Sequence, residues 1–197
     1  MKLTKVEILI QEGPFSQSEE WKTILREICT AVSEVQWPPG SARFILNPDK
    51  GRGRGVACGV KPIKAGFLEG LGRFGWSINE RGNPRRFDAV KTLADGTIFG
   101  LEWETGNVSS THRSVNRILL ARHDGQLTGG AVVLPTREMY QYLTDRIGNW
   151  EEIVPYFPIW RSGQWTNGVL VIVGVEQDGV SKDVPRIPKG TDGRSLV

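Results

Sequence analysis

The spacing of hydrophobic residues predicts an alternation of helices and strands along the chain. Between Gln17 and Val35 apolar residues recur every three or four positions, which is typical of an amphipathic helix, and Ser16 or Ser18 is suited to cap it. Similar segments predict further helices over residues 64–71, 109–122 and 136–147, the last with Thr136 as N-cap. Continuous apolar runs predict buried strands over residues 130–134 and 168–174. This order predicts an α/β fold with a central mixed sheet of five to six strands flanked by helices.

An acidic hairpin is predicted between these elements. Residues 86–93 and 97–104 both have strand composition and are separated by Ala94-Asp95-Gly96. A two-residue turn would place Asp88 opposite Trp103, with the carboxylates on opposite faces. A three-residue loop, with Gly96 in the left-handed conformation, places Asp88 opposite Glu102 instead. We expect the second register, because it gives one mostly apolar face and one face that carries the carboxylates.

Glu102 and Glu104 flank a single residue of the second strand, so both side chains lie on the same face. Neighbouring carboxylates repel each other unless positive charge lies between them, and a divalent cation is the usual source of that charge. With Asp88 opposite, the three acids would form an oxygen-ligand site suited to Mg²⁺ and phosphodiester chemistry. A surface hairpin with solvated acids explains the same pattern, and the pattern alone leaves both interpretations open.

The composition is that of a globular protein with unevenly distributed charge. The 197 residues carry a net charge of +3, and 39% of them are hydrophobic, which fits a single domain over residues 1–197. Residues 41–91 contain eleven Lys and Arg against four Asp and Glu. A metal-dependent nuclease needs such a basic surface around a small acidic centre, although a solvated basic face is the commoner origin of this charge pattern.

Other sequence features narrow the function classes. The apolar runs are too short for a membrane span, and the N-terminus has no signal-peptide pattern, so we expect a cytoplasmic protein without a membrane partner. Cys29 and Cys58 are too few for a disulfide framework or a zinc site, which fits a reducing compartment. Gly70–Gly75 has the spacing of a dinucleotide-binding loop, but no hydrophobic strand precedes it.

Several segments resemble the BamHI family of type II restriction endonucleases. The longest is GLEWETGNVSSTHRSVN at residues 100–116. Shorter ones are YLTDR at 142–146, EEIVPYF at 151–157 and VPRIPKGTDG at 184–193. The resemblance implies a restriction-endonuclease-like core that acts as a symmetric homodimer on double-stranded DNA. It also implies Mg²⁺ as cofactor, with two ions per active site and Mn²⁺ as a substitute, and cleavage of GGATCC after the first G. A cognate methyltransferase is expected in the same host, but not as a physical partner.

The resemblance also assigns roles to individual residues. Glu80, Asp88 and Glu102 match the metal-binding carboxylates, and Glu104 matches the acid that replaces the lysine of most relatives, so the expected catalytic residues are Asp88, Glu102 and Glu104. The expected DNA-binding residues are Lys64, Asn107, Ser109, Ser110, Arg113, Asp145, Arg146, Gly190, Asp192, Gly193 and Arg194. Alternative functions are a nuclease of the same fold with another recognition site, a non-cleaving DNA-binding protein, and a small-molecule phosphoesterase.

Overall fold

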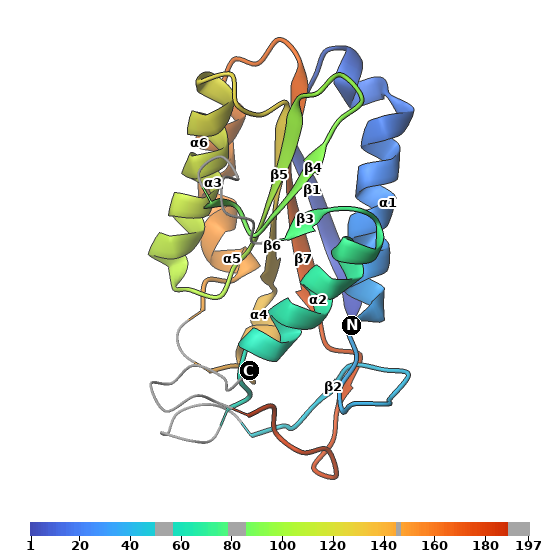
Figure 1. Ribbon diagram of the computed structural model, residues 1–197. Helices are drawn as coiled ribbons and strands as arrows, with labels where there is room; N and C mark the ends of the chain where they lie inside the picture. The colour runs from blue at the N-terminus through green and yellow to red at the C-terminus, as the bar shows by residue number, and fades with distance from the viewer. Residues whose placement is uncertain (50–56, 79–85, 145–146, 189–197) are drawn as a thin grey trace.

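A six-stranded mixed sheet forms the centre of the protein (Figure 1). The structure is a computed structural model that describes residues 1–49, 57–78, 86–144 and 147–188. Across the sheet the strand order is β1-β7-β6-β5-β4-β3. The strands are β1 (Lys2–Glu12), β3 (Ser77–Ile78), β4 (Ala89–Thr92), β5 (Ile98–Trp103), β6 (Gly129–Pro135) and β7 (Gly168–Glu176). This architecture confirms the predicted mixed sheet.

The centre of the sheet is parallel and its edges are antiparallel. β6 runs parallel to both β5 and β7, whereas β1, β4 and β3 pair antiparallel with their neighbours. Every residue of β6 is buried, because helices cover both faces of the sheet. A strand covered on both faces reads as a continuous apolar run rather than an alternating one. For that reason the runs at 130–134 and 168–174 predicted strands correctly.

Helices cover the two faces of the sheet in two layers (Figure 1). α1 (Glu19–Glu34) and α2 (Lys61–Arg73) lie on one face, and α3 (Val108–His123), α5 (Trp150–Ile153) and α6 (Phe157–Arg161) lie on the other. Each layer has its own core, and alternate residues of β7 supply both: Val171 and Val173 belong to the first, Leu170 and Ile172 to the second. The sheet is therefore the shared wall of two hydrophobic cores.

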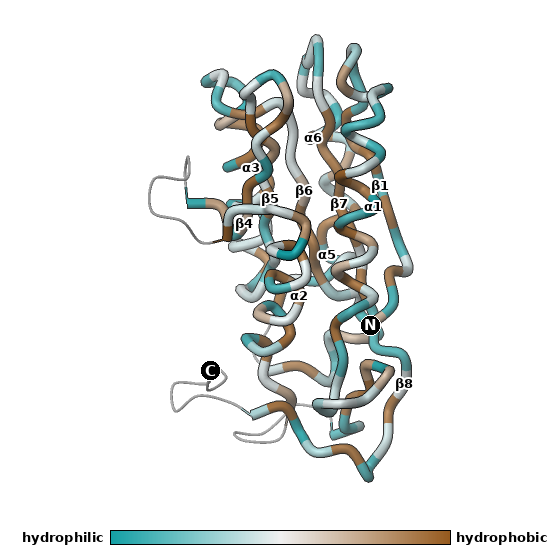
Figure 2. The backbone as a smooth tube through the Cα atoms, turned by 45° about the vertical axis from the view of Figure 1, so that its right-hand side comes forward, coloured by the Kyte–Doolittle hydropathy of each residue, from teal (hydrophilic) through white to brown (hydrophobic). Residues whose placement is uncertain are grey.

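The first helix begins and ends close to the predicted residues. Ser18 is the N-cap, and its hydroxyl accepts a hydrogen bond from the backbone N–H of Trp21 at 3.1 Å. Hydropathy alternates along α1 (Figure 2), and its buried residues include Ile24, Ile28 and Val32. α2 is longer than the predicted 64–71, because Pro62 is accommodated in its first turn. Gly70–Gly75 therefore lies at the C-terminal end of a helix, not in a phosphate-binding loop.

The predicted helix over residues 136–147 is wrong beyond its first turn. α4 spans only Arg137–Tyr140. The following residues hydrogen-bond to a distant segment: Cys58 N–H donates to Tyr142 O at 2.9 Å, and Thr144 N–H donates to Cys58 O at 2.8 Å. These tertiary bonds replace the helical bonds that the hydrophobic spacing predicted. Thr136 occupies the N-cap position, but its hydroxyl donates to Glu176 instead of capping the helix.

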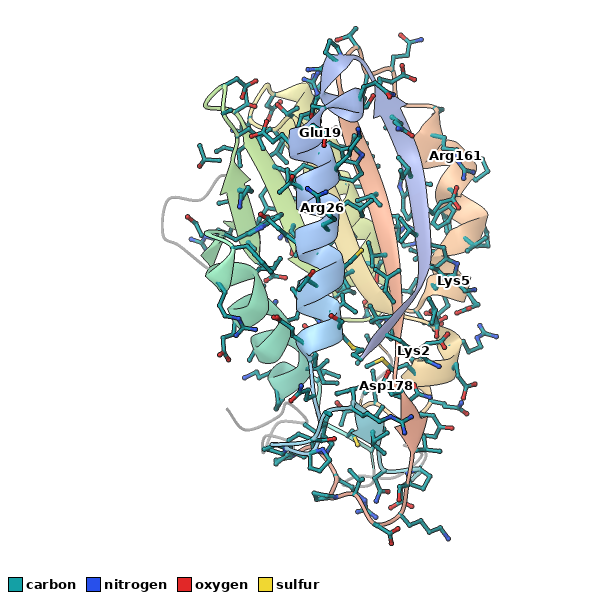
Figure 3. All side chains as sticks on the ribbon, turned by 90° about the vertical axis from the view of Figure 1, so that its right-hand side faces the viewer. Lys2, Lys5, Glu19, Arg26, Arg161 and Asp178 are labelled. Atoms are coloured by element: carbon teal, nitrogen blue, oxygen red, sulfur yellow. The ribbon has the colours of Figure 1, made fainter. Side chains whose placement is uncertain are left out.

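The N-terminal strand β1 was not predicted as a separate element, although it supplies one edge of the sheet. Its charged side chains lie along the rim beside α5 and α6 (Figure 3). Lys5 pairs with Glu151 at 3.2 Å, and Arg161 pairs with Glu7. Charges on an edge strand oppose pairing with another sheet, and here they also attach the strand to the neighbouring helices.

A small second sheet lies below the main one. β2 (Ile45–Leu46) pairs in parallel with β8 (Gly179–Val180). Within the described parts of the chain, no helix is both long and apolar enough to cross a membrane.

Candidate active site

The predicted three-residue hairpin loop is confirmed. Leu93 N–H donates to Thr97 O at 2.8 Å, and Gly96 has φ 81°, in the left-handed region that favours glycine. Ala89 pairs with Leu101 across the two strands. The next pair outward in this register is Asp88 and Glu102, as the sequence predicted.

Asp88 is held in place by two partners on different elements. Its Oδ2 accepts a hydrogen bond from the backbone N–H of Trp103 at 2.8 Å, which attaches it to β5. Its Oδ1 forms an ion pair with the ammonium group of Lys64, which α2 brings from the other side. Lys64, expected near DNA, therefore lies directly in the acidic centre.

Glu102 is a buried carboxylate that forms an ion pair with a residue of a helix on the same side of the sheet. Its residue is 5% exposed, and it forms an ion pair with Arg117 of α3. Burial raises the pKa of Glu102, and the charge of Asp88 raises it further, whereas Arg117 and Lys64 lower it. Because the pKa is raised overall, the two cations do not fully compensate the buried negative charge. The position therefore favours binding of additional positive charge.

Glu104 is buried beside Glu102 and is held by neutral donors. Its Oε1 accepts from Gly106 N–H at 2.6 Å, and its Oε2 accepts from the Ser114 hydroxyl at 3.2 Å. Burial is the largest cause of the raised pKa of Glu104, and these hydrogen bonds lower it only in part. A Cβ on Gly106 would lie 2.5 Å from Ser110 Oγ, so the turn after Glu104 leaves no room for a larger residue.

α3 begins immediately after this acidic strand. Asn107 is its N-cap and accepts from Ser110 N–H at 3.1 Å. Asn107, Ser109 and Arg113 are exposed, and Arg113 donates to Ser110 Oγ at 2.8 Å. The structure therefore brings these expected DNA-binding residues together on the first turns of the helix that also contacts the acids.

The acids have the chemistry of a divalent-metal site. Among the described residues, no group of three or more His, Cys, Asp or Glu is close enough to hold a metal ion. Asp88 and Glu102 nevertheless offer carboxylate oxygens, which hard cations such as Mg²⁺ prefer, at a position where negative charge is incompletely compensated. The donor set fits such an ion, and Lys64 and Arg117 form ion pairs with the same two acids.

Several expected site residues lie outside the described parts of the chain. These are Glu80, Asp145, Arg146, Gly190, Asp192, Gly193 and Arg194. The expected third metal-binding carboxylate and the C-terminal DNA-binding segment are therefore not placed.

Comparison with known proteins identifies the family. The sequence profile described as "Restriction endonuclease BamHI" matches residues 1–194. The chain is 41% identical over 202 residues to the type II restriction enzyme OkrAI of Oceanobacter kriegii, and the alignment covers 100% of both chains. The chain belongs to the BamHI family of restriction endonucleases. A second relative, the type II restriction enzyme BamHI of Bacillus amyloliquefaciens, is 31% identical over 182 residues, covering 86% of this chain and 81% of the relative.

A solved structure confirms the predicted fold of the BamHI-family chain. The crystal structure of restriction endonuclease BglII complexed with a DNA 16-mer has a TM-score of 0.63 and 10% sequence identity, covering 89% of this chain and 79% of that one. At this identity the likeness shows the fold alone. Together with the relatives, it confirms a type II restriction enzyme, a site-specific deoxyribonuclease, with a restriction-endonuclease-like core.

Two residues that contact the acids were not found from the sequence. Ser114 and Arg117 are three positions apart on α3, so they project from one face of the helix toward Glu104 and Glu102. The signal was present in the helical spacing, because the neighbouring Val115 and Ile118 are buried against the same sheet. A polar pair flanked by core residues indicates a buried polar contact.

The electrostatics of Glu104 predict a change in stability. Glu104→Gln retains the side-chain shape and removes a buried charge for which the described residues provide no cationic partner. We expect the free energy of unfolding of the metal-free protein to rise by about 1 kcal/mol at neutral pH. Urea denaturation in EDTA measures it.

Glu27→Gln is the matched control for that experiment. Glu27 accepts from Trp76 Nε1 at 2.7 Å and pairs with Lys91 at 3.1 Å, so its charge has a partner. For Glu27→Gln we expect the free energy of unfolding to fall by about 1 kcal/mol. Destabilisation by both substitutions would show that the buried charge of Glu104 does not lower the stability of the protein.

Proposed function

We propose that this chain hydrolyses double-stranded DNA at GGATCC, after the first G, in a reaction that requires Mg²⁺. The observation that carries the proposal is the facing pair Asp88 and Glu102, with Glu104 two residues further on, at the start of the helix that presents Asn107 and Arg113. This arrangement joins an acidic centre to a DNA-facing helix within one short segment. The resemblance of residues 100–116 to the BamHI family supports the site and the cut position.

In the proposed reaction, Asp88 and Glu102, together with Glu80, would hold the divalent ions by their carboxylate oxygens. When bound, such ions lower the pKa of the attacking water and stabilise the charge on the leaving 3′ oxygen. Trp103 N–H orients Asp88 through its 2.8 Å hydrogen bond. The backbone thus determines the direction of one ligand before metal or DNA binds.

Glu104 is proposed to orient and deprotonate the attacking water. Its raised pKa brings a carboxylate closer to the pH at which it can exchange protons effectively. The hydrogen bonds from Gly106 and Ser114 hold both of its oxygens, so the carboxylate cannot rotate freely.

Base recognition is proposed for the exposed residues at the start of α3 and for the segment after Thr144. Arg113 and Arg146 suit bidentate contact with guanine, Asn107 suits adenine, and Asp145 can accept from cytosine. Ser109 and Ser110 lie in the first turn of α3, whose N-terminus favours a phosphate. Lys64 and the C-terminal residues Gly190, Asp192, Gly193 and Arg194 are proposed to contact DNA nearby.

A homodimer is proposed, with α3, α5 and α6 as its interface. The described residues of this side include the exposed apolar side chains Leu120 (49%), Tyr156 (42%) and Ile159 (66%). His112 of α3 packs against Tyr156 with ring centroids 4.3 Å apart, so the helices form one continuous surface. A two-fold dimer matches a palindromic site, because each subunit reads one half of it.

We further propose that the chain acts as a single domain in the cytoplasm of a host that protects its own sites with a cognate methyltransferase. Cys29 and Cys58 are free thiols, which is consistent with a reducing compartment.

Digestion of a sequenced plasmid tests the reaction and the recognition site together. With Mg²⁺ we expect discrete fragments whose ends map after the first G of GGATCC, and with EDTA no cleavage. Mn²⁺ should replace Mg²⁺. Discrete ends at another sequence would contradict the GGATCC proposal and the base contacts assigned above. The protein would still be a site-specific nuclease. Cleavage in EDTA would contradict the metal requirement.

The role of Glu104 is tested by Glu104→Lys, which installs the residue of most relatives. We expect cleavage to fall by at least about 10²-fold, because a lysine at this position cannot accept the proton of the attacking water at neutral pH. Single-turnover cleavage rates at saturating enzyme measure it. Retained strong cleavage would remove the need for a carboxylate base at residue 104.

The dimer is tested by sedimentation equilibrium. The wild-type protein should have twice the 21.9 kDa mass of the chain. Ile159→Asp places a charge on the proposed interface and should shift the protein toward monomer. Val180→Asp, at an exposed apolar residue (45%) of β8, is the matched control and should stay dimeric. A monomeric wild type, or equal effects of both substitutions, would contradict the interface.

A further inference from the structure

Two cations enter the acidic centre from helices on opposite faces of the sheet. Lys64 of α2 pairs with Asp88, and Arg117 of α3 pairs with Glu102. The side chains of Arg117 and Glu102 differ in exposure, at 35% and 7%. The carboxylate is therefore buried, while part of the guanidinium group remains accessible to a ligand from solvent.

The proposed reaction needs positive charge near the scissile phosphate. Most relatives provide a lysine at the position of Glu104, by the resemblance described above, and a carboxylate cannot perform that function. Glu104 itself is held by Gly106 N–H and the Ser114 hydroxyl. Arg117 places a guanidinium group on the same acidic cluster from the neighbouring helix.

Arg117 also lies on the DNA-facing helix. It follows the exposed Arg113 by four positions, and residues so spaced project from the same side of an α-helix, with Cβ atoms about 6 Å apart. A guanidinium group offers five N–H donors in a planar fork that matches phosphate oxygens. Of these donors, Nη1 is directed to Glu102.

We propose that Arg117 is a phosphate-binding residue of the cutting centre, and that Glu102 sequesters it until DNA and metal ions occupy the site. The inference rests on the proposed function, in which Glu102 binds metal beside the scissile phosphate. With Glu102 engaged by a cation, Arg117 would lose its partner, and its guanidinium group would be available to the DNA backbone. Arg117 thereby replaces, from α3, the positive charge that the strand lacks.

A double-substitution cycle on DNA affinity in EDTA tests this proposal without relying on catalysis. The four proteins are the wild type, Glu102→Gln, Arg117→Met and the double variant, titrated with a fluorescent duplex that contains GGATCC. Glu102→Gln should release Arg117 and tighten binding by about tenfold, the effect of one charge-assisted phosphate contact. Arg117→Met alone should change affinity by less than about twofold, because the wild-type arginine is already occupied.

The double variant gives the decisive comparison. If Arg117 is the released contact, Glu102→Gln should no longer tighten binding in the Arg117→Met background. The slope of log affinity against log salt should be steeper for Glu102→Gln than for the double variant by about one phosphate contact. The proposal is overturned if Glu102→Gln tightens binding equally in both backgrounds, because removal of an acidic charge near DNA would then explain the whole effect.

Two further variants control for charge and folding. Arg117→Lys, when combined with Glu102→Gln, should retain part of the gain in DNA affinity, since an ammonium group also binds phosphate. Arg26→Met removes an exposed cation of α1, which lies on the face of the sheet opposite to α3, and should leave the gain in DNA affinity intact. Loss of the gain in both Arg117→Lys and Arg26→Met would indicate a general effect of charge or stability and would overturn the proposal.

Parallel cleavage assays with Mg²⁺ separate this inference from the proposed function. Glu102→Gln should abolish cleavage if Glu102 holds metal. Retained cleavage would overturn the acidic-centre proposal and the inference with it. If Glu102→Gln abolishes cleavage but tightens DNA binding equally with Arg117 present and in the Arg117→Met background, only the proposed role of Arg117 is overturned. The backbone contact does not depend on sequence, so the cycle remains valid with a duplex of any site that digestion identifies.

Discussion

The antiparallel pairing of β4 with β5 determines where the chemistry of this protein lies. The three-residue loop ending at Gly96 sets the register, and the register places Asp88 opposite Glu102. A slip of one residue would move one of these acids to the opposite face of the sheet. Because β5 also pairs with β6, the acidic residues are attached to the fully buried centre of the sheet.

The same pairing creates an electrostatic cost that the surrounding helices only partly offset. Burial raises the pKa values of Glu102 and Glu104, while α2 and α3 contribute Lys64 and Arg117. Functional sites commonly retain such destabilised charges, since the ligand supplies the missing interaction. Here the missing interaction is positive charge, which DNA-bound metal ions would provide.

The elements that the sequence predicted well are those whose local pattern agrees with their tertiary contacts. The hairpin register, α1 and the strands β6 and β7 are of this kind. The helix expected over 136–147 stops after one turn, because Cys58 binds its backbone from a segment about eighty residues earlier in the chain. The contact of Arg117 could not be predicted from the sequence for a similar reason. Helical spacing shows that Arg117 shares a face with Ser114, but only the folded chain shows that this face contacts Glu102.

α3 connects the two halves of the proposed activity, since its first two turns carry the exposed residues proposed to bind DNA and its inner face contacts the acids. In the proposed activity, Asp88 and Glu102 together bind the metal. A crystal structure with a GGATCC duplex and Ca²⁺, a hard cation that binds carboxylate oxygens, tests this. We expect a Ca²⁺ ion about 2.3–2.6 Å from oxygens of both carboxylates. A Ca²⁺ ion that binds beside the DNA without contacting either carboxylate would contradict it.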